Sequence, residues 1–337
     1  MLLKISYFSL FLLLSAASVH AGNFRNWGEN SGQNPFAFAQ SNLGPRTTSL
    51  SGAGGSMPSA DPYSVQVNPA ALEQNIRRNN FALAWETGAL DRRQGLFAWN
   101  TSWNRFLVQG IYAWTDNNPI DGVDETGLAT GTSYRPFDQS AMITTTFLTQ
   151  HFRMGVTGKL LRDHLSSDPG DQDGMAWGFD WGLQLRTPSP RYSFGVSVLD
   201  LGRQFQAYTT NGVDNLALNT RIRLSSHYRL AQVRGLTILF DTDIPRYTQP
   251  FGHLGLEYSP TPWLFLRSGL QRTLPSLQNS VEQVLMGKAD KTATSDHWSL
   301  ASFGFGANWK ALTLDYSIQL LRDGLGQQHR IGLRSGF

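Results

Sequence analysis

Small, polar and charged side chains occupy every second position in segments whose other positions are apolar or aromatic. In residues 175–186, for example, Asp180 alternates with Trp177, Phe179 and Trp181. Alternate side chains of a β-strand point to opposite faces, so a strand with one face in lipid would turn such charges inward. The same parity assigns ten charged residues to an interior face: Lys159, Asp180, Arg221, Arg223, Arg229, Glu257, Arg267, Asp315, Arg330 and Arg334.

Two kinds of chemistry are open to such inward charges. They could form a network of ion pairs that fills the interior and holds other parts of the chain. They could also form a selectivity lining or a site for an anionic ligand, because a narrow channel of low dielectric constant focuses their field. The sequence leaves both alternatives open.

Catalytic constellations have little support in the chain. The candidate pairs are His164 beside Asp163 and His297 beside Asp296, and neither is accompanied by a Gly-x-Ser-x-Gly elbow. Adjacent residues of a strand point to opposite faces, which separates each pair. We therefore expect a protein that is not an enzyme and that needs no cofactor.

A metal site is equally poorly supported. The run 168–174, Asp-Pro-Gly-Asp-Gln-Asp-Gly, invites a calcium interpretation, but its spacing is not that of an EF-hand loop. The chain has no cysteine, and its seven histidines include no HExxH pair. We expect this run to be a turn-forming surface loop.

Composition excludes two further classes of protein. The chain of 337 residues is 40% hydrophobic and 16% charged, with a net charge of +3, and its densest basic pairs are Arg77-Arg78 and Arg92-Arg93. Such sparse clustering excludes a nucleic-acid footprint. After the first residues there is no apolar run of about 18 residues, which excludes a mature helical membrane protein.

The N-terminus predicts export. One cation, Lys4, precedes an apolar stretch over residues 5–14, and Val19-His20-Ala21 closes the segment with a cleavage site. The alternative is an N-terminal anchor, but the apolar stretch is too short to span a bilayer. Residues 1–21 are therefore predicted to be a signal peptide cleaved after Ala21.

From residue 80 onward, the dominant signal is period-two alternation between clusters of Gly, Pro, Asn and Asp. It predicts fourteen strands, an even number that lets an antiparallel barrel close without edges. The ranges are 80–87, 94–103, 105–115, 138–150, 152–163, 174–187, 191–201, 215–230, 235–244, 251–259, 262–272, 297–309, 311–322 and 328–337. A secreted β-sandwich is the soluble alternative.

Two observations favour an all-β transmembrane barrel over a sandwich. Tryptophans stand near predicted strand ends, where an interfacial girdle would place them: Trp85, Trp103, Trp114, Trp263, Trp298 and Trp309. The chain also ends on Phe337, with Ile331 and Leu333 on the same face, which resembles the C-terminal signal read by the outer-membrane assembly machinery. Ser335 departs from that pattern.

Residues 22–79 differ in kind from the predicted barrel, 80–337. They are rich in Gly, Ser, Pro and Asn and show weak periodicity. We expect a plug inside the lumen, where protein and water can satisfy irregular backbone; a flexible periplasmic tail is the alternative. The plug motif is Asp61-Pro62 followed by Asn68-Pro69-Ala70, in which Asn before Pro favours a turn.

Several of these runs resemble the PorV/PorQ family, relatives of the FadL outer-membrane transporters. The N-terminal signature is Gly-Ala-Gly-Gly with Asp61-Pro62 and Asn68-Pro69-Ala70. Runs in the family's order follow at 158–161 (Gly-Lys-Leu-Leu), 179–183 (Phe-Asp-Trp-Gly-Leu), 198–202 (Val-Leu-Asp-Leu-Gly), 255–258 (Gly-Leu-Glu-Tyr), 265–269 (Phe-Leu-Arg-Ser-Gly), 314–316 (Leu-Asp-Tyr) and 329–333 (His-Arg-Ile-Gly-Leu). Asp200 and Ala71 depart mildly from the pattern.

The resemblance implies a fourteen-stranded barrel with an N-terminal plug in the bacterial outer membrane, in contact with outer-membrane lipid. For function it implies a part in protein secretion of the type IX kind, with secreted cargo proteins as partners. The alternative is FadL-like passage of hydrophobic small molecules. The long connections 116–135 and 275–296 are typical of the extracellular side, and Val281, Val284, Leu285 and Met286 suit a short amphipathic lid.

Overall fold

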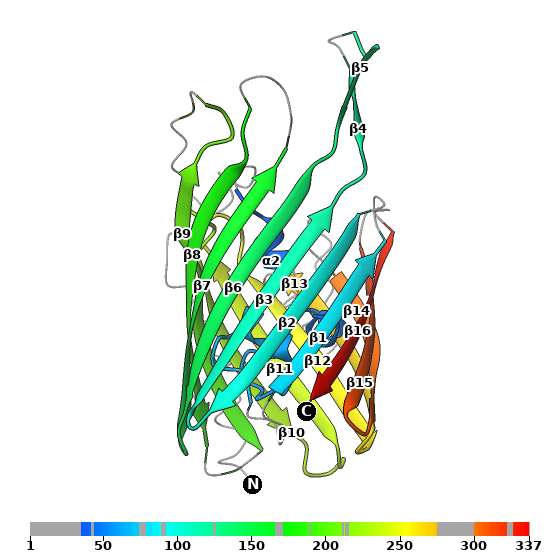
Figure 1. Ribbon diagram of the computed structural model, residues 1–337. Coiled ribbons are helices and arrows are strands. Elements are labelled where there is room, and N and C mark those ends of the chain that lie inside the picture. Colours follow the sequence, from blue (N-terminus) through cyan, green and yellow to red (C-terminus); the bar gives the residue numbers. More distant parts are fainter. Residues whose placement is uncertain are drawn as a thin grey trace.

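In the computed structural model, fourteen antiparallel strands close into a barrel (Figure 1). The structure describes residues 35–41, 44–73, 79–88, 92–123, 126–165, 171–187, 189, 191–210, 212, 216–274, 300–321 and 326–336. The barrel strands are β1 (Asn79–Thr87), β2 (Arg93–Trp103), β3 (Phe106–Asp116), β6 (Phe137–Leu148), β7 (Phe152–His164), β8 (Gly174–Arg186), β9 (Tyr192–Gln206), β10 (Arg221–Arg229), β11 (Leu236–Pro245), β12 (Phe251–Thr261), β13 (Leu264–Thr273), β14 (Leu300–Trp309), β15 (Leu312–Leu320) and β16 (Gln327–Gly336). The predicted fold class and strand number are confirmed.

The barrel closes where its first and last strands meet. β1 pairs with β16 in register from Asn80 opposite Gly336 to Thr87 opposite His329. The other barrel strands pair with their neighbours in the chain, apart from β3, which pairs with β6 across an inserted hairpin. Among the fourteen barrel strands no edge is left to pair with another molecule, which is the condition for a sheet within a bilayer.

The alternation seen in the sequence sorts side chains between the two faces of the wall. Along β7, Met154, Val156 and Leu160 are exposed on the outside, whereas Thr157 and Lys159 are buried on the inside. An apolar outer band around a polar lumen is typical of outer-membrane barrels. The chain is therefore a barrel of the bacterial outer membrane.

The two ends of the barrel differ. Short turns at 104–105, 149–151, 262–263 and 310–311 lie at the same end as the C-terminus of β16, whereas the longer connections lie at the opposite end (Figure 1). Short turns are periplasmic and long loops extracellular in such barrels, which fixes the orientation. Trp103, Trp263 and Trp309 are all exposed beside these turns, at the expected height of an interfacial girdle.

The boundary between β9 and β10 differs from its prediction. β9 runs on to Gln206 and β10 begins only at Arg221, against predicted boundaries of 201 and 215. Asp200 has a positive φ of 60°, and the register of β8 against β9 shifts beside it, so a bulge absorbs an extra residue without ending the strand. Residues 216–220 consequently lie outside β10, and Leu218, an apolar residue that the alternation of the predicted strand 215–230 would place on the lipid face, is buried inside.

The connection 116–135 contains a hairpin of its own. β4 (Ile120–Val123) pairs with β5 (Ala129–Tyr134) in a separate two-stranded sheet that rises beyond the barrel rim (Figure 1). The sequence predicts only a long extracellular connection here. Its apolar content is too low to give the strong alternation by which the barrel strands are recognised.

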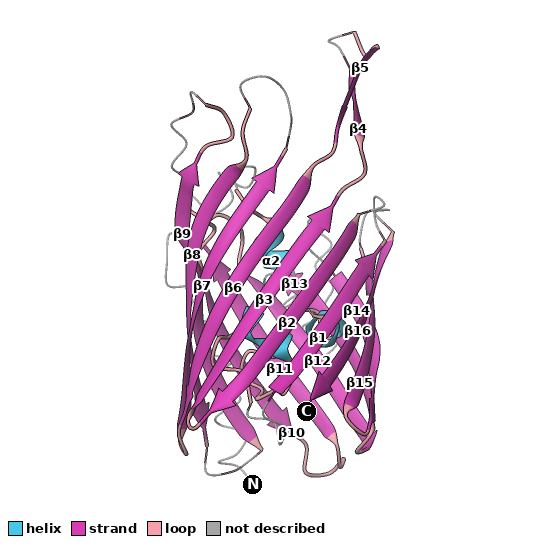
Figure 2. Ribbon diagram, in the orientation of Figure 1, coloured by secondary structure: helices cyan, strands magenta, loops and turns pink. Residues whose placement is uncertain are grey.

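In the part of the chain that the structure describes, the helices are few and short. They are α2 (Phe38–Ser41), α3 (Pro45–Ser49) and the 3-10 helix η1 (Pro62–Gln66), all drawn inside the barrel in Figure 2. Among the described residues, no helix combines the length and apolar character that a membrane span requires.

A charge placed on the lipid face tests the sidedness of the wall. Ile143 is 68% exposed at the middle of β6, and we expect Ile143→Arg to destabilise the barrel in lipid vesicles by about 2–4 kcal/mol. Ile120→Arg is the matched control, because Ile120 is similarly exposed on the hairpin above the rim. Urea titrations read by electrophoretic mobility give both values, and equal effects would contradict the assigned membrane position.

Candidate functional site

The lumen holds residues 44–73 of the N-terminal segment, here called the plug. Pro45 occupies the first turn of α3, where its missing N–H costs nothing. Asp61 caps η1 by accepting a hydrogen bond from Tyr63 N at 3.1 Å, and Pro62 begins that helix. The predicted Asp61-Pro62 motif thus starts a helical turn within the buried plug.

The Asn68-Pro69-Ala70 motif lies against the inner wall at β6, β7 and β8. Asn68 Nδ2 donates to Gly55 O at 2.7 Å and to Leu183 O at 3.4 Å, and Asn68 Oδ1 accepts from Ala70 N at 2.9 Å. Pro69 O accepts a hydrogen bond of 2.7 Å from the Thr146 hydroxyl on β6. One asparagine therefore fixes its own turn and ties it both to the rest of the plug and to β8.

Glycines make room for the plug on the inner wall. A Cβ atom on Gly155 would overlap Pro69, one on Gly182 would overlap Asn68, and one on Gly269 would overlap the backbone at Leu50. These strands therefore need glycine because plug backbone approaches the wall directly, as happens where two backbones meet without side chains between them.

A first ion-pair chain links the plug to one side of the barrel. Arg46 donates to both carboxylate oxygens of Glu257, at 3.0 and 3.2 Å. Glu257 also accepts from Arg267 at 2.8 Å, and Arg267 donates to Asp315 at 2.6 Å. The four groups alternate in sign and are buried, so each charge is neutralised by a neighbour.

A second network lies across β7 to β11. Lys159 Nζ stands 2.8 Å from Asp180 and 2.6 Å from Asp200. Arg221 lies between Asp200 at 3.5 Å and Asp243 at 3.4 Å.

The second network also reaches the plug. Asp243 accepts two bonds from Arg223, at 2.5 and 2.6 Å. Arg223 in turn donates to Gly52 O at 3.0 Å, and Asp241 accepts from the amides of Gly54 and Gly55 at 3.1 and 2.8 Å. Charged wall residues thereby satisfy the plug's irregular backbone.

A third contact lies at the closing strand. Arg330 on β16 pairs with Glu86 on β1 and donates to the Thr48 hydroxyl at 2.7 Å. Of the ten inward charges predicted from parity, eight are therefore buried in ion pairs. Arg229 is instead exposed at the end of β10, and Arg334 is half-buried, donating to Thr313 at 3.2 Å, because strand ends escape the packing of the lumen.

Sequence reasoning missed several partners in these networks. Arg46 and Glu86 pair with residues more than 200 positions away, a separation that no local pattern reveals. Asp241 and Asp243 occupy alternate positions of β11, so the parity argument applied to the other strands would have found them.

Part of the inner wall is apolar. Plug residues Tyr63, Val65 and Leu72 cover it and form one buried cluster with it. We call this surface the apolar wall; it comprises Ala82, Ala84, Leu96, Ala98, Leu107, Ile111, Ala113 and Met142, on strands β1, β2, β3 and β6. The lumen is thus two-sided. Most of its ion pairs lie on β7 to β16, whereas β1, β2, β3 and β6 carry the apolar wall together with inward polar residues such as Glu86, Gln94 and Gln109.

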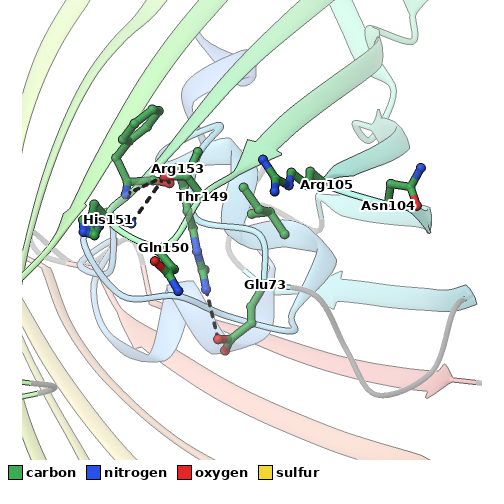
Figure 3. Close-up of a pocket in the computed structure, with 9 residues that line it drawn as sticks. Glu73, Asn104, Arg105, Thr149, Gln150, His151 and Arg153 are labelled. Carbon is green, nitrogen blue, oxygen red and sulfur yellow. Dashed lines mark hydrogen bonds and ion pairs between the residues drawn. The ribbon is translucent and has the colours of Figure 1, made fainter.

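At the periplasmic end, the plug ends beside a pocket of about 870 Å³ (Figure 3). Buried Arg153 donates to Glu73 at 3.0 Å and to Leu72 O at 3.4 Å, which clamps the end of the plug to β7. Arg105 and His151 also line the pocket, as does Leu148, which packs against the apolar wall. The apolar wall therefore reaches this opening through Leu148.

The remaining candidate residues stand apart from the plug contacts. His164 lies 2.7 Å from Asp173, and Asp163 accepts from Tyr208 at 2.7 Å. Although partial burial acts in the opposite direction, hydrogen bonds from His164 and Arg162 hold the pKa of Asp173 below its ordinary value. This arrangement at the extracellular rim is a set of ion pairs in which no nucleophile takes part.

Other predicted features lie outside the described residues: Ala21, Phe337, Trp298, the His297 and Asp296 pair, residues 168–170 and the connection 275–296. Ile331 and Leu333 are exposed on the outer face of β16. Within the described ranges, no group of three or more His, Cys, Asp or Glu side chains is placed to hold a metal ion.

Comparisons with known proteins identify a fold. No protein-family model and no curated protein matches the chain. Among solved structures, the toluene transporter TbuX of Ralstonia pickettii is 12% identical, with a TM-score of 0.60 over 89% of this chain and 100% of its own.

Two further solved structures have a similar fold. The toluene transporter TodX of Pseudomonas putida is 12% identical, with a TM-score of 0.60 over 87% of this chain and 96% of its own. A FadL homologue of Pseudomonas aeruginosa is 12% identical, with a TM-score of 0.54 over 88% and 98%. The chain therefore has the fold of FadL-like outer-membrane channels.

Replacing a wall glycine tests how closely the plug packs. We expect Gly182→Val to push the Asn68 turn off β8 and to destabilise plug packing by about 1–3 kcal/mol, because the new side chain would overlap Asn68. Gly158→Val is the control: Gly158 lies on neighbouring β7 with no atom within 4 Å of its added Cβ. Limited proteolysis should cut the plug faster in Gly182→Val alone, and unchanged protection would contradict the packing.

Proposed function

We propose that the protein is a non-enzymatic channel that lets hydrophobic small molecules cross the outer membrane. The observation on which this rests is the apolar wall. Polar interiors are usual in outer-membrane barrels, and ion pairs or hydrogen bonds would suffice to hold a plug. A strip of Leu, Ile, Met and Ala side chains on four strands instead offers a surface along which an apolar solute could move.

The apolar wall is covered in this state. Tyr63, Val65 and Leu72 lie on it, and the Tyr63 hydroxyl donates to Leu96 O at 3.2 Å. A solute that reaches the apolar wall gains about 25 cal/mol per Å² of apolar area removed from water, which offsets the burial that Tyr63, Val65 and Leu72 lose when they leave it. Passage therefore requires movement of the plug away from β1, β2, β3 and β6.

The charged side of the lumen holds one part of the plug in place while another part is free to move. Its ion pairs and hydrogen bonds hold residues 46–55 against β9 to β16, away from the apolar wall. A plug anchored by one side can move at the other while these ion pairs, which are expensive to break, stay intact. Movement of residues 61–73 would break the Arg153–Glu73 pair, in which the Glu73 side chain is already partly exposed. Residues 61–73, which cover the apolar wall and reach the periplasmic pocket, form the segment that we expect to move.

The fold comparisons support the same class of solute. TbuX and TodX are described as toluene transporters, and a TodX variant as a monoaromatic hydrocarbon channel. Their likeness to this chain concerns the fold, so the apolar wall remains the argument for function here. In this proposal residues 1–21 direct export, 22–79 include the plug, and 80–337 form the barrel inserted by the assembly machinery.

Protein secretion is the second candidate. It rests on the ordered motifs that resemble the PorV/PorQ family, and on the β4–β5 hairpin, which rises above the rim where cargo proteins would dock. That role does not need the apolar wall, so we rank it below passage of solutes. Co-purification of secreted proteins that share a C-terminal β-domain, abolished by deletion of residues 118–135, would reverse the ranking.

Uptake is the direct test. Cells of a Gram-negative host that produce the protein should accumulate radiolabelled toluene faster than cells that lack it. We expect Ala113→Gln to slow this uptake several-fold, because Ala113 is fully buried in the apolar wall and the amide would interrupt its surface.

The matched control for this test is Ala141→Gln. Ala141 lies opposite Tyr112 on the lipid-facing side of β6, one residue away from the inward position that pairs with Ala113. Folding of both variants is checked by heat-modifiable mobility. Equal uptake with and without the protein would refute the proposed function, and equal uptake by the two folded variants would refute the apolar route.

A further inference from the structure

A groove indents the outer wall of the barrel just above its periplasmic turns. Its volume is about 440 Å³, within the range of about 300–1,000 Å³ that ligand sites commonly have. We call it the outer groove; its outward lining, from β11, β12, β13 and the β10–β11 turn, comprises Val233, Leu236, Leu256, Tyr258, Leu266 and Ser268. Leu256, Tyr258 and Leu266 are exposed on the outside of their strands, so the groove opens toward the hydrocarbon of the bilayer.

The strand register connects the outer groove to an aromatic pair. Ser268 opposes Leu256, which opposes Ile238. Ile238 opposes Tyr228, and Tyr228 opposes Tyr192. The two tyrosine rings stack with centroids 4.7 Å apart and an interplanar angle of 19°. Tyrosines near strand ends are typical of the membrane interface, where the ring lies in hydrocarbon and the hydroxyl reaches polar headgroups.

Three exposed arginines adjoin this surface at its periplasmic edge. Arg191 and Arg229 are each next in sequence to one ring of the tyrosine pair, and Arg234 follows Val233 of the groove lining. The Arg229 amide donates to Arg191 O at 2.9 Å, which holds the first two side by side. Within the described ranges, no salt bridge occupies any of the three side chains. Three guanidinium groups are therefore available for an anion beside the groove.

The periplasmic turns as a whole carry positive charge without negative charge. Turns 104–105, 149–151, 187–191, 230–235, 262–263 and 310–311 contain Arg105, Arg191, Arg234 and Lys310 but no Asp or Glu. Anionic lipid headgroups attract basic residues held close to the membrane surface. The guanidinium group also matches the geometry of a phosphate group, to which it can donate two parallel hydrogen bonds.

The outer groove and the arginines together select one class of ligand. Arginines alone would also suit an acidic protein or free phosphate, and an apolar groove alone would accept any acyl chain. Because the two features adjoin each other on the lipid-facing wall, the molecule that satisfies both has hydrocarbon chains and a negatively charged phosphate headgroup. A zwitterionic phospholipid has the chains but lacks the net charge that attracts basic residues.

We propose that the outer groove and the three arginines form a binding site for an anionic diacyl phospholipid of the periplasmic leaflet. An acyl chain lies in the outer groove against Leu256 and Leu266, and the headgroup phosphate accepts hydrogen bonds from Arg191, Arg229 and Arg234. The site lies on the outside of the barrel, so it does not depend on what the lumen carries.

The experiment measures lipid binding to the detergent-solubilised full chain by native mass spectrometry. Dioleoyl-phosphatidylglycerol is the anionic probe, and dioleoyl-phosphatidylcholine has the same chains without net charge. We expect phosphatidylglycerol to bind more tightly, and Arg234→Gln to weaken its binding about fivefold, the usual contribution of one arginine beside an anionic surface.

The matched control for this charge is Lys310→Gln. Lys310 is an exposed cation on the β14–β15 turn, which does not line the outer groove, so its loss should leave both affinities unchanged. Equal affinity of the unaltered protein and Arg234→Gln for phosphatidylglycerol would overturn the proposal. The same loss of affinity in Lys310→Gln would also overturn it, because charge would then act without a site.

A second pair of variants tests the outer groove at constant charge. Ser268→Phe fills the groove, and we expect it to weaken the binding of both lipids several-fold because the acyl chain loses its place. Ala141→Phe adds the same ring to the lipid face of β6, outside the groove, and should leave both affinities unchanged. Heat-modifiable mobility checks that each variant is folded. Undiminished binding by folded Ser268→Phe would overturn the lipid site and leave the arginines to an acidic partner.

Discussion

Every backbone amide and carbonyl at membrane depth must find a partner within the protein, and the closed barrel is the consequence of that constraint. Pairing between β1 and β16 satisfies the two strands that would otherwise be edges. Once the sheet is closed, side chains have only two directions, lipid or lumen. The same requirement applies inside the lumen, because the plug has irregular backbone whose polar groups also need hydrogen-bond partners.

Charged side chains of the barrel wall supply these hydrogen-bond partners for the plug backbone. Asp241 accepts from two consecutive plug amides, Arg223 and His253 bond plug carbonyls, and Arg46 enters a carboxylate pair from the plug side. Such buried charges add little net stability, but removing one partner from a pair costs about 3–5 kcal/mol. They therefore specify one position for residues 46–55 more than they strengthen the fold.

Period two made the barrel predictable from sequence, because lipid on one side and a filled lumen on the other force alternation on nearly every strand. Alternation is a poorer guide where a residue lies in a bulge or outside the membrane. Asp200 adds a bulge residue, and the β4–β5 hairpin stands outside the membrane, so neither obeys the parity rule.

The candidate site was less predictable than the barrel. The alternation of side chains identifies inward charges such as Arg223 and Glu257, but their partners in the plug lie far away in the sequence. The apolar wall was missed for a different reason. Strands such as β2 have apolar residues on both faces, Leu96 and Ala98 inside with Phe97 and Trp99 outside, so composition there does not separate lumen from lipid.

Enclosure has a consequence for the order of assembly. The plug precedes the barrel strands in the chain, yet β16, the final strand of the barrel, contributes Arg330 to Thr48 and places Gly332 against Pro45. The seam is thus built partly from contacts with the segment that it encloses. If the barrel closed empty, the plug would have to enter it through one end. If the barrel closes around the plug, the β1–β16 pairing and its plug contacts form in one step.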